Sequence, residues 1–287
     1  MKRAAMSWAG NWAVSAAMLL ALSSSGPNRA WGQASTLPSA QPAPVKDEAA
    51  RGHQLLDQMV AALGGQVWLN RDTERLEGKS ASFYKGMPNP YQAAFEEYLR
   101  LAPFGERVVV VSKQGVFIPT TKRDVAEVWT PDNGFEVTFR GRKDLPRIDV
   151  EDFQRRRLHT IDTVVRDWLK RPGTLVTFEG SDMDDRRLVD KVSILTLDND
   201  AITLALDATT HLPRSRSFQW RNPVYKDFDT DLERYDDWQT EDGVMTALTI
   251  TRYRNGDMIS QRFLTKVQYH LPLAADLFDP DRPLAKK

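Results

Sequence analysis

The stretch RLVDKVSILTLDNDAITLALD, residues 187–207, decides the fold class of this chain. Its two halves, residues 187–197 and 201–207, are rich in Val, Leu and Ile, which favour extended strands. Between them, Asp198-Asn199-Asp200 is a short polar segment typical of a hairpin turn. The stretch therefore predicts two antiparallel strands joined by a tight turn, rather than a strand–helix–strand unit.

The same pattern continues on both sides of this hairpin. Turn signals built from Pro, Asn, Asp or Gly separate further apolar runs, at residues 87–90, 103–105, 131–134 and 241–243. The runs predict strands at residues 73–84, 92–101, 106–112, 124–130, 134–140, 174–180, 212–220, 228–239, 244–254 and 258–269. In the run 228–239, Leu232 and Tyr235 depart from strict alternation. Strands that recur at roughly 8–12 residues predict an antiparallel sheet or barrel.

Two segments have helical periodicity instead. Residues 47–63 place apolar side chains three or four positions apart, and Gly64-Gly65 marks the end of the run. Residues 149–170 follow the same spacing, at Leu158, Ile161, Val164, Val165 and Trp168. We expect one helix in each segment, with its apolar stripe packed against the sheet.

The first 34 residues have the pattern of a secretory signal peptide. Lys2 and Arg3 precede an apolar run at residues 13–22, and Gly32-Gln33-Ala34 offers small residues for cleavage. The apolar run is about half of the roughly 20 residues that a spanning helix needs, so cleavage and export to the periplasm are expected. The chain has no Cys, which excludes a lipid-anchoring cysteine, disulfides and thiolate metal sites.

This pattern divides the chain into three expected parts. Residues 1–34 are the signal peptide, residues 35–46 are a Pro-rich flexible tether, and residues 47–287 are a single β-rich domain. The whole chain has 39 basic and 39 acidic residues, and removing the signal peptide leaves a net charge of −3. That balance provides no electrostatic footprint for nucleic acid.

Catalytic and metal motifs are missing from the sequence. There is no nucleophile elbow, phosphate-binding loop or dinucleotide fingerprint, and the four histidines are widely separated. A calcium loop that started at Asp182 would need Gly and Glu where Arg187 and Ser193 stand. We therefore expect no enzyme activity, no metal and no cofactor, although distant residues can assemble a catalytic site and a hydrolase remains the least favoured alternative.

A basic zone lies at Arg140, Arg142, Lys143 and Arg147, with Arg155–Arg157 nearby. It is either a solvated face or a contact for anionic lipid head groups, because basic side chains are attracted to such surfaces. The sequence leaves both interpretations open.

Several short segments resemble one known family. They are AALGG at residues 61–65, LEGKSA at 76–81, LALDATTHLP at 204–213, EDGVM at 241–245 and ADLFDP at 275–280. Together with the signal peptide they are similar to outer membrane lipoprotein-sorting proteins, the LolA-like superfamily of lipoprotein carriers. The resemblance covers most of residues 47–283.

The resemblance implies an α+β, mainly β fold. It is an incomplete antiparallel β-barrel, or half-barrel, with the helices of residues 47–63 and 149–170 covering its concave face. The implied function is a carrier, without cofactor, that holds acyl chains of lipids or lipoproteins in an apolar cavity. Burial of a 16-carbon chain would contribute about 12 kcal/mol before ordering costs. An envelope sensor or interaction module of the same fold is the alternative.

The aromatic and apolar side chains that we expect to line such a cavity come from both the strands and the second helix. They are Phe83, Phe95, Tyr98, Trp129, Phe139, Phe153, Ile161 and Trp168. Packing in the core is the alternative for each of them. The expected partners are lipid or lipoprotein acyl chains, with an inner- or outer-membrane envelope protein as a further candidate, and the chain is expected to be a monomer.

Overall fold

A computed structural model describes residues 45–90, 92–111, 125–282 and 284. The predicted signal peptide and all but the end of the predicted tether lie outside the described residues. Among the described residues, no helix is both long enough and apolar enough to cross a membrane.

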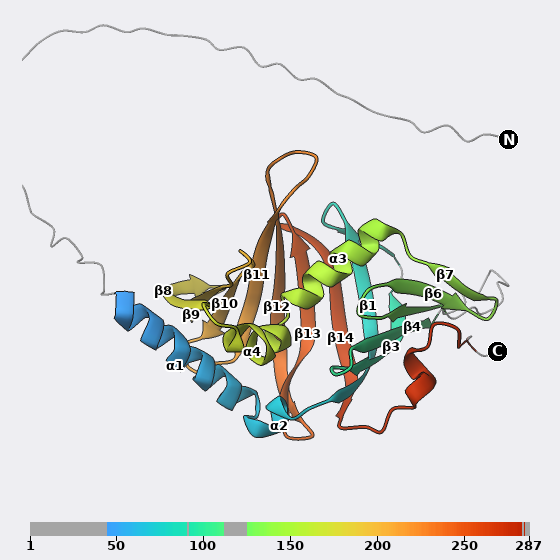
Figure 1. Ribbon diagram of the computed structural model, residues 1–287, viewed down its shortest axis with the longest axis horizontal. Coiled ribbons are helices and arrows are strands. Elements are labelled where there is room, and N and C mark those ends of the chain that lie inside the picture. The colour runs from blue at the N-terminus through green and yellow to red at the C-terminus, as the bar shows by residue number, and fades with distance from the viewer. Residues whose placement is uncertain (1–44, 91, 112–124, 283, 285–287) are drawn as a thin grey trace, which may run out of the picture. The chain divides into compact units, whose positions relative to one another are not determined.

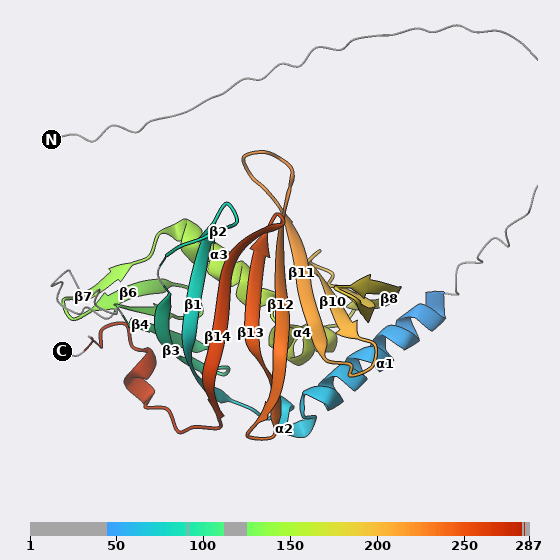
Figure 2. The same cartoon turned by 180° about the vertical axis from the view of Figure 1, so that it is seen from behind.

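The described residues form a 14-stranded antiparallel sheet in the order β7-β6-β5-β4-β3-β1-β14-β13-β12-β11-β10-β9-β8, with β2 paired to β1. The sheet stays open between β7 and β8, and Figures 1 and 2 show helices α3 and α4 across one of its faces. The predicted mainly β, incomplete barrel is therefore confirmed.

The bounds of the strands are β1 Thr73–Tyr84, β2 Met87–Pro88, β3 Ala93–Arg100, β4 Gly105–Val111, β5 Val125–Trp129, β6 Gly134–Thr138, β7 Gly141–Asp144, β8 Leu175–Asp184, β9 Arg187–Leu195, β10 Ala201–Asp207, β11 Pro213–Arg221, β12 Phe228–Glu241, β13 Val244–Arg254 and β14 Asp257–Tyr269. The helices are α1 Val45–Leu63, α2 Gln66–Leu69, α3 Arg147–Leu158, α4 Ile161–Arg166 and the 3₁₀ helices η1 Trp168–Lys170 and η2 Ala275–Phe278.

Short turns with left-handed residues set the register of the hairpins. Asp242 and Gly243, between β12 and β13, have φ of 49° and 81°. Asn255 and Gly256, between β13 and β14, have φ of 52° and 86°. Positive φ at both central residues gives a turn whose twist matches that of the flanking strands. The predicted turns at 198–200 and 241–243 are both present.

The predicted helix at 149–170 is wrong in one respect, because the structure divides it. α3 ends at Leu158, and α4 begins at Ile161 with Thr160 as its N-cap. The Thr160 hydroxyl accepts a 3.2 Å hydrogen bond from the Thr163 backbone N–H. The apolar spacing continues through the break, so periodicity alone does not reveal it.

The main core lies between the helices and the sheet. Leu55, Leu56 and Met59 of α1 pack with side chains from β8 to β10, β13, β14 and β1. Gly52 lets α1 approach β8, because a Cβ there would lie 2.9 Å from Cγ1 of Val176. A smaller cluster of Ala126, Val128 and Val137 joins β5 and β6.

Candidate functional site

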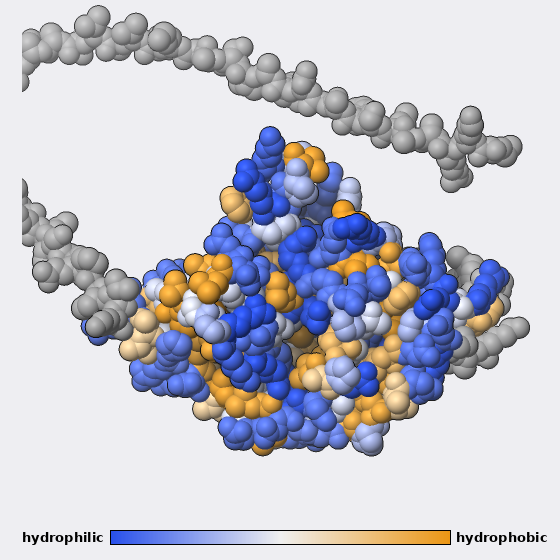
Figure 3. Space-filling view, in the orientation of Figure 1, coloured by the Kyte–Doolittle hydropathy of each residue, from blue (hydrophilic) through white to orange (hydrophobic). Residues whose placement is uncertain are grey.

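A hollow of about 430 Å³, which we call the first hollow, is lined by α3, α4 and the sheet. Figure 3 shows a recess near the centre of this face, with hydrophobic and hydrophilic residues around it. Its apolar lining consists of Leu76, Leu99, Leu101, Phe104, Phe153 and Ile250. Its charged lining consists of Glu97, Glu106, Arg156, Arg157, Asp162, Arg166, Asp167, Arg216, Glu233 and Arg262. The lining is thus more polar than the sequence predicts.

A second hollow of about 220 Å³ adjoins the first and shares with it Leu76, Thr160, Asp162, Arg216, Glu233 and Ile250. The remaining lining combines apolar side chains with a charged pair, Arg71 and Glu74, and its apolar members include Leu63, Trp68, Ile161, Trp238, Val244 and Leu264. The Arg216–Glu233 pair therefore borders both hollows. The volume of the first hollow falls within the roughly 300–1,000 Å³ typical of small-molecule sites.

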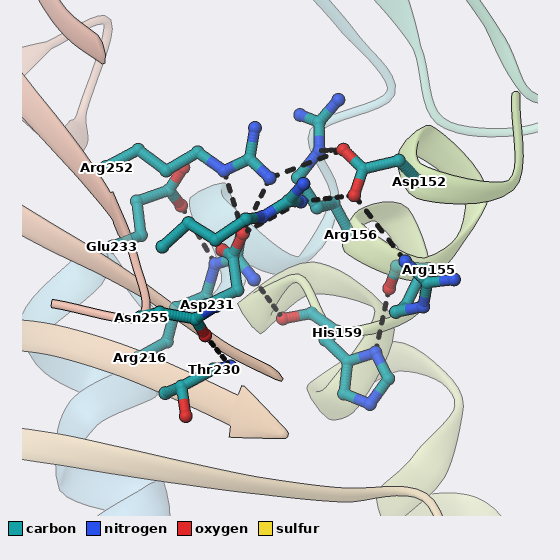
Figure 4. A network of polar contacts seen from close by, with 11 residues as sticks. Asp152, Arg155, Arg156, His159, Arg216, Thr230, Asp231, Glu233, Arg252 and Asn255 are labelled. Atoms are coloured by element: carbon teal, nitrogen blue, oxygen red, sulfur yellow. Dashed lines mark hydrogen bonds and ion pairs between the residues drawn. The ribbon is translucent and has the colours of Figure 1, made fainter. Parts of the chain in front are cut away.

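α3 is tied to the sheet mainly by ion pairs, which Figure 4 shows from close by. Asp152 of α3 accepts hydrogen bonds from Arg254 and, at 3.4 Å, from Arg252, both on β13. Arg252 also donates to Asp231 of β12 at 2.6 Å. Burial alone would raise the pKa of Asp152, but Arg156, Arg254 and Arg252 lower it below its ordinary value. The carboxylate is thus held in its charged form.

α4 is tied to the short helix α2. Arg166 donates to the carbonyl oxygens of Leu69 at 2.6 Å and Trp68 at 2.9 Å, at the end of α2. Its Nε also donates to Asp162 at 3.0 Å, and the second oxygen of Asp162 accepts from Arg71 at 2.5 Å. These contacts satisfy carbonyl groups that the last turn of a helix leaves free.

The two helices differ more in their apolar packing than in their ion pairs. Val164 and Val165 of α4 and Trp168 of η1 are buried in the main core, and Trp168 has no exposed surface. In α3 the buried side chain is Phe153, whose ring stacks on Trp129 at a centroid distance of 3.9 Å. Gly134 makes room for this stack, because a Cβ there would lie 2.4 Å from the Trp129 ring.

A buried polar group lies where α3 ends. Arg216 of β11 donates from Nε to Glu233 at 2.8 Å and to the Tyr235 hydroxyl at 3.0 Å, and from Nη1 to the His159 carbonyl oxygen at 2.9 Å. Burial would raise the pKa of Glu233, but Arg216 lowers it below its ordinary value. The His159 ring stacks on Phe218 at 4.1 Å, and burial lowers its pKa. His159 is thus a neutral packed side chain.

Two carboxyl groups of neighbouring strands form the other polar part of the first hollow. Arg262 of β14 donates to Glu97 of β3, and its guanidinium lies 4.3 Å from the centre of the Phe95 ring. Burial, together with the nearby Glu97, raises the pKa of Glu106 of β4 to about 8. Glu106 is therefore protonated at neutral pH and can donate a hydrogen bond.

The eight predicted lining residues lie in different parts of the structure. Phe153 lines the first hollow and Ile161 lines the second. Trp129 packs behind Phe153, while Phe95 and Trp168 belong to the main core. Neither hollow is lined by the remaining predicted residues, Phe83, Tyr98 and Phe139.

Sequence reasoning missed the charged residues of the site. Asp231, Glu233 and Tyr235 share one face of β12, and all three contact the network beneath the helices. The sequence feature that could have pointed to these residues was the departure of Leu232 and Tyr235 from strict alternation. Within the described ranges, no three His, Cys, Asp or Glu side chains are placed to hold a metal ion.

No protein-family model matches the chain, and no curated protein matches it in sequence. A crystal structure of a DUF1329 family protein from Desulfovibrio piger is similar in fold, with a TM-score of 0.50, 12% identity and coverage of 81% of this chain and 97% of that one. A domain described as outer membrane lipoprotein-sorting, from Vibrio parahaemolyticus, has a TM-score of 0.49, 8% identity and coverage of 82% and 100%. A LolA superfamily protein from Nitrosomonas europaea has a TM-score of 0.48, 9% identity and coverage of 79% and 96%.

At these identities the likeness concerns the fold alone. The descriptions of the Vibrio parahaemolyticus and Nitrosomonas europaea structures name the family that the short segments of this chain resemble. The chain thus has the fold of the Desulfovibrio piger DUF1329 protein over most of both chains.

Proposed function

We propose that the chain is an exported, periplasmic carrier that holds the acyl chain of a lipid or lipoprotein in the two hollows. The observation that carries the proposal is the unequal attachment of the two helices that line the first hollow. α4 and η1 are anchored by Val164, Val165 and Trp168 in the main core. α3 buries Phe153, packs its last residue, the partly buried Leu158, against that core, and is otherwise held mainly by ion pairs. Water can solvate the charged groups of α3 when they separate, whereas moving α4 would expose apolar core, so α3 is the part that opens.

The break between α3 and α4 supports this division of roles. His159 and Thr160 separate the two helices, and Arg216 holds the His159 carbonyl at 2.9 Å. A rotation at this point would move Phe153 away from Trp129 and open the first hollow while α4 stays in the core. The second hollow, lined in part by Leu63, Trp68 and Leu264, would then take the end of an acyl chain, and the more charged first hollow its polar end.

Native mass spectrometry of the protein purified from the periplasm tests the proposal. We expect adducts with the mass of a phospholipid, or uptake of added phospholipid by the lipid-free protein. A clean mass that persists after phospholipid is added would contradict it. If the lipid-free protein instead retains an envelope protein, a sensor of the same fold is favoured.

A pair of neighbouring variants makes the test specific to the hollow. Leu99 lines the first hollow, while its neighbour Tyr98 projects from the opposite face of β3, where its hydroxyl donates to Glu96. Leu99→Trp should reduce phospholipid uptake by filling the hollow, and Tyr98→Trp should leave it unchanged. Equal uptake by both variants would place the lipid elsewhere.

A further inference from the structure

Exposed apolar side chains gather in the turns along one edge of the sheet. β1, β13 and β11 run in the same direction, because one antiparallel strand separates each from the next. The turns that follow these three strands therefore share one edge, which we call the turn edge. Figures 1 and 2 both show the β1–β2 and β11–β12 tips on the same side of the sheet.

The β11–β12 loop is ordered and projects three apolar side chains. Val224 is 75%, Tyr225 80% and Phe228 61% exposed. The Asn222 side-chain oxygen accepts from the backbone N–H groups of Val224 at 2.9 Å and Tyr225 at 3.1 Å. Because the loop is fixed by its own hydrogen bonds, the exposure of these side chains is built into the fold.

The β1–β2 turn repeats the arrangement on a smaller scale. Tyr84 pairs with Met87 across a two-residue turn, and these side chains are 67% and 65% exposed. Lys85 and Gly86 have φ of 50° and 73°, which fixes a tight hairpin. The Lys85 ammonium lies 5.6 Å from the centre of the Tyr84 ring, so a cation and an aromatic ring project together.

Basic residues accompany the apolar ones. Counted with the closing residues of the hairpins, the turns after β1, β13 and β11 contain Lys85, Arg221, Lys226 and Arg254 against Asp227 and Asp257. Farther along this edge, the turn between β9 and β10 contains Asp198 and Asp200 and ends the basic stretch.

We propose that the turn edge from β1 to β12 docks on a bilayer surface that contains anionic lipid. Tyr rings with an apolar body and a polar tip favour the interfacial region of a membrane. Lys and Arg near that surface are attracted to anionic head groups. The combination of Tyr84, Met87, Val224, Tyr225 and Phe228 with Lys85, Arg221 and Lys226 matches both preferences. This surface lies outside the two hollows, so the inference does not depend on the proposed carrier function.

A single fluorescent label tests insertion directly, because the natural chain has no Cys. Val224→Cys, labelled with an environment-sensitive dye, should shift to the blue when vesicles containing phosphatidylglycerol are added. Met183→Cys is the matched control, because Met183 is 61% exposed in β8 beside the β8–β9 turn, at the opposite edge of the sheet. Its label should not respond. A response at both sites, or at neither, would overturn the proposal.

Vesicle co-sedimentation measures the contribution of the side chains. Tyr225→Ser with Phe228→Ser should weaken binding at least about tenfold, since each ring loses buried apolar area. Met183→Ser with Leu188→Ser removes a cross-strand exposed pair at the opposite edge and should leave binding unchanged. Vesicles of phosphatidylcholine alone should bind more weakly than those with phosphatidylglycerol, and added salt should reduce that difference.

If the edge instead docks on a protein, the unmodified chain will stay in the supernatant with protein-free vesicles, which overturns the proposal. Circular dichroism of each variant shows whether the fold is retained. Phospholipid uptake by the Tyr225→Ser, Phe228→Ser variant separates this proposal from the carrier function. Uptake from detergent micelles should continue in that variant even where binding to vesicles is lost.

Discussion

The Arg216 guanidinium of β11 holds the carbonyl oxygen of His159 at 2.9 Å, at the residue where α3 ends. The same side chain neutralises Glu233 and contacts the Tyr235 hydroxyl. The buried Arg216 therefore links the sheet to the break between α3 and α4, at the position where the two hollows adjoin.

Arg216→Met should destabilise the protein by about 3–5 kcal/mol, because it leaves the mostly buried Glu233 carboxylate without the cation that hydrogen-bonds to it. Urea denaturation measures this loss. The double variant Arg216→Met, Glu233→Leu should recover part of it, because no unpaired charge remains. A double variant as unstable as the single one would show that the His159 contact, and not the ion pair, dominates.

Asp152→Asn should loosen α3 without unfolding the chain. The change weakens the contacts of α3 with Arg252 and Arg254, while α4 keeps its buried anchor. We expect faster exchange of bound phospholipid, followed by transfer of a fluorescent lipid between vesicles and protein. Glu151→Gln is the matched control on the same helix, because its 2.7 Å pair with Arg147 is exposed and contributes little. Equal exchange rates in the two variants would argue against opening at α3.

Much of this fold follows from the sequence, because turn residues and alternation act locally. The turns at 198–200 and 241–243 were predictable from Asn, Asp and Gly, which tolerate the left-handed conformation that the hairpins need. The single helix predicted for 149–170 failed because periodicity continues from Leu158 through Ile161 to Trp168, across the break capped by Thr160.

The site was less predictable than the fold. Aromatic residues were natural candidates for an apolar lining, yet Phe95 and Trp168 fill the core and Phe153 stacks on Trp129. The side chains that give the first hollow its character are charged. Their partners, such as Arg262 with Glu97, are separated by 165 residues along the chain, a distance over which local sequence patterns have no information.

Phe153 and Trp168 should respond differently to truncation. Trp168→Ala removes a fully buried ring from the main core and should cost about 3–5 kcal/mol in the free energy of unfolding. Phe153→Ala removes the buried contact of α3 and should reduce phospholipid uptake more than its effect on stability explains. Paired measurements of denaturation and uptake check this. If the ratio of lost phospholipid uptake to lost stability is the same in Phe153→Ala as in Trp168→Ala, α3 is a core helix and not a lid.

Stability should fall as the pH rises through the range in which Glu106 ionises only in the unfolded chain. Its pKa is raised from 4.5 to about 8 by burial and by Glu97, so its contribution is complete below about pH 4.5. The contribution is lost progressively between about pH 4.5 and 8, and it reaches a plateau above that.

A pKa difference of one corresponds to about 1.4 kcal/mol, which sets an upper limit of about 5 kcal/mol for the Glu106 effect. Urea denaturation across this range should show the decline in the natural chain. Glu106→Gln keeps a neutral hydrogen-bonding side chain and should flatten the profile, although the raised pKa values of Glu74 and Glu127 leave a residual slope. Arg262 and Arg156 face Glu106 and stay charged throughout, so they do not contribute to the difference between the two profiles. Identical profiles for both proteins would mean that Glu106 ionises in the folded chain at its ordinary pKa.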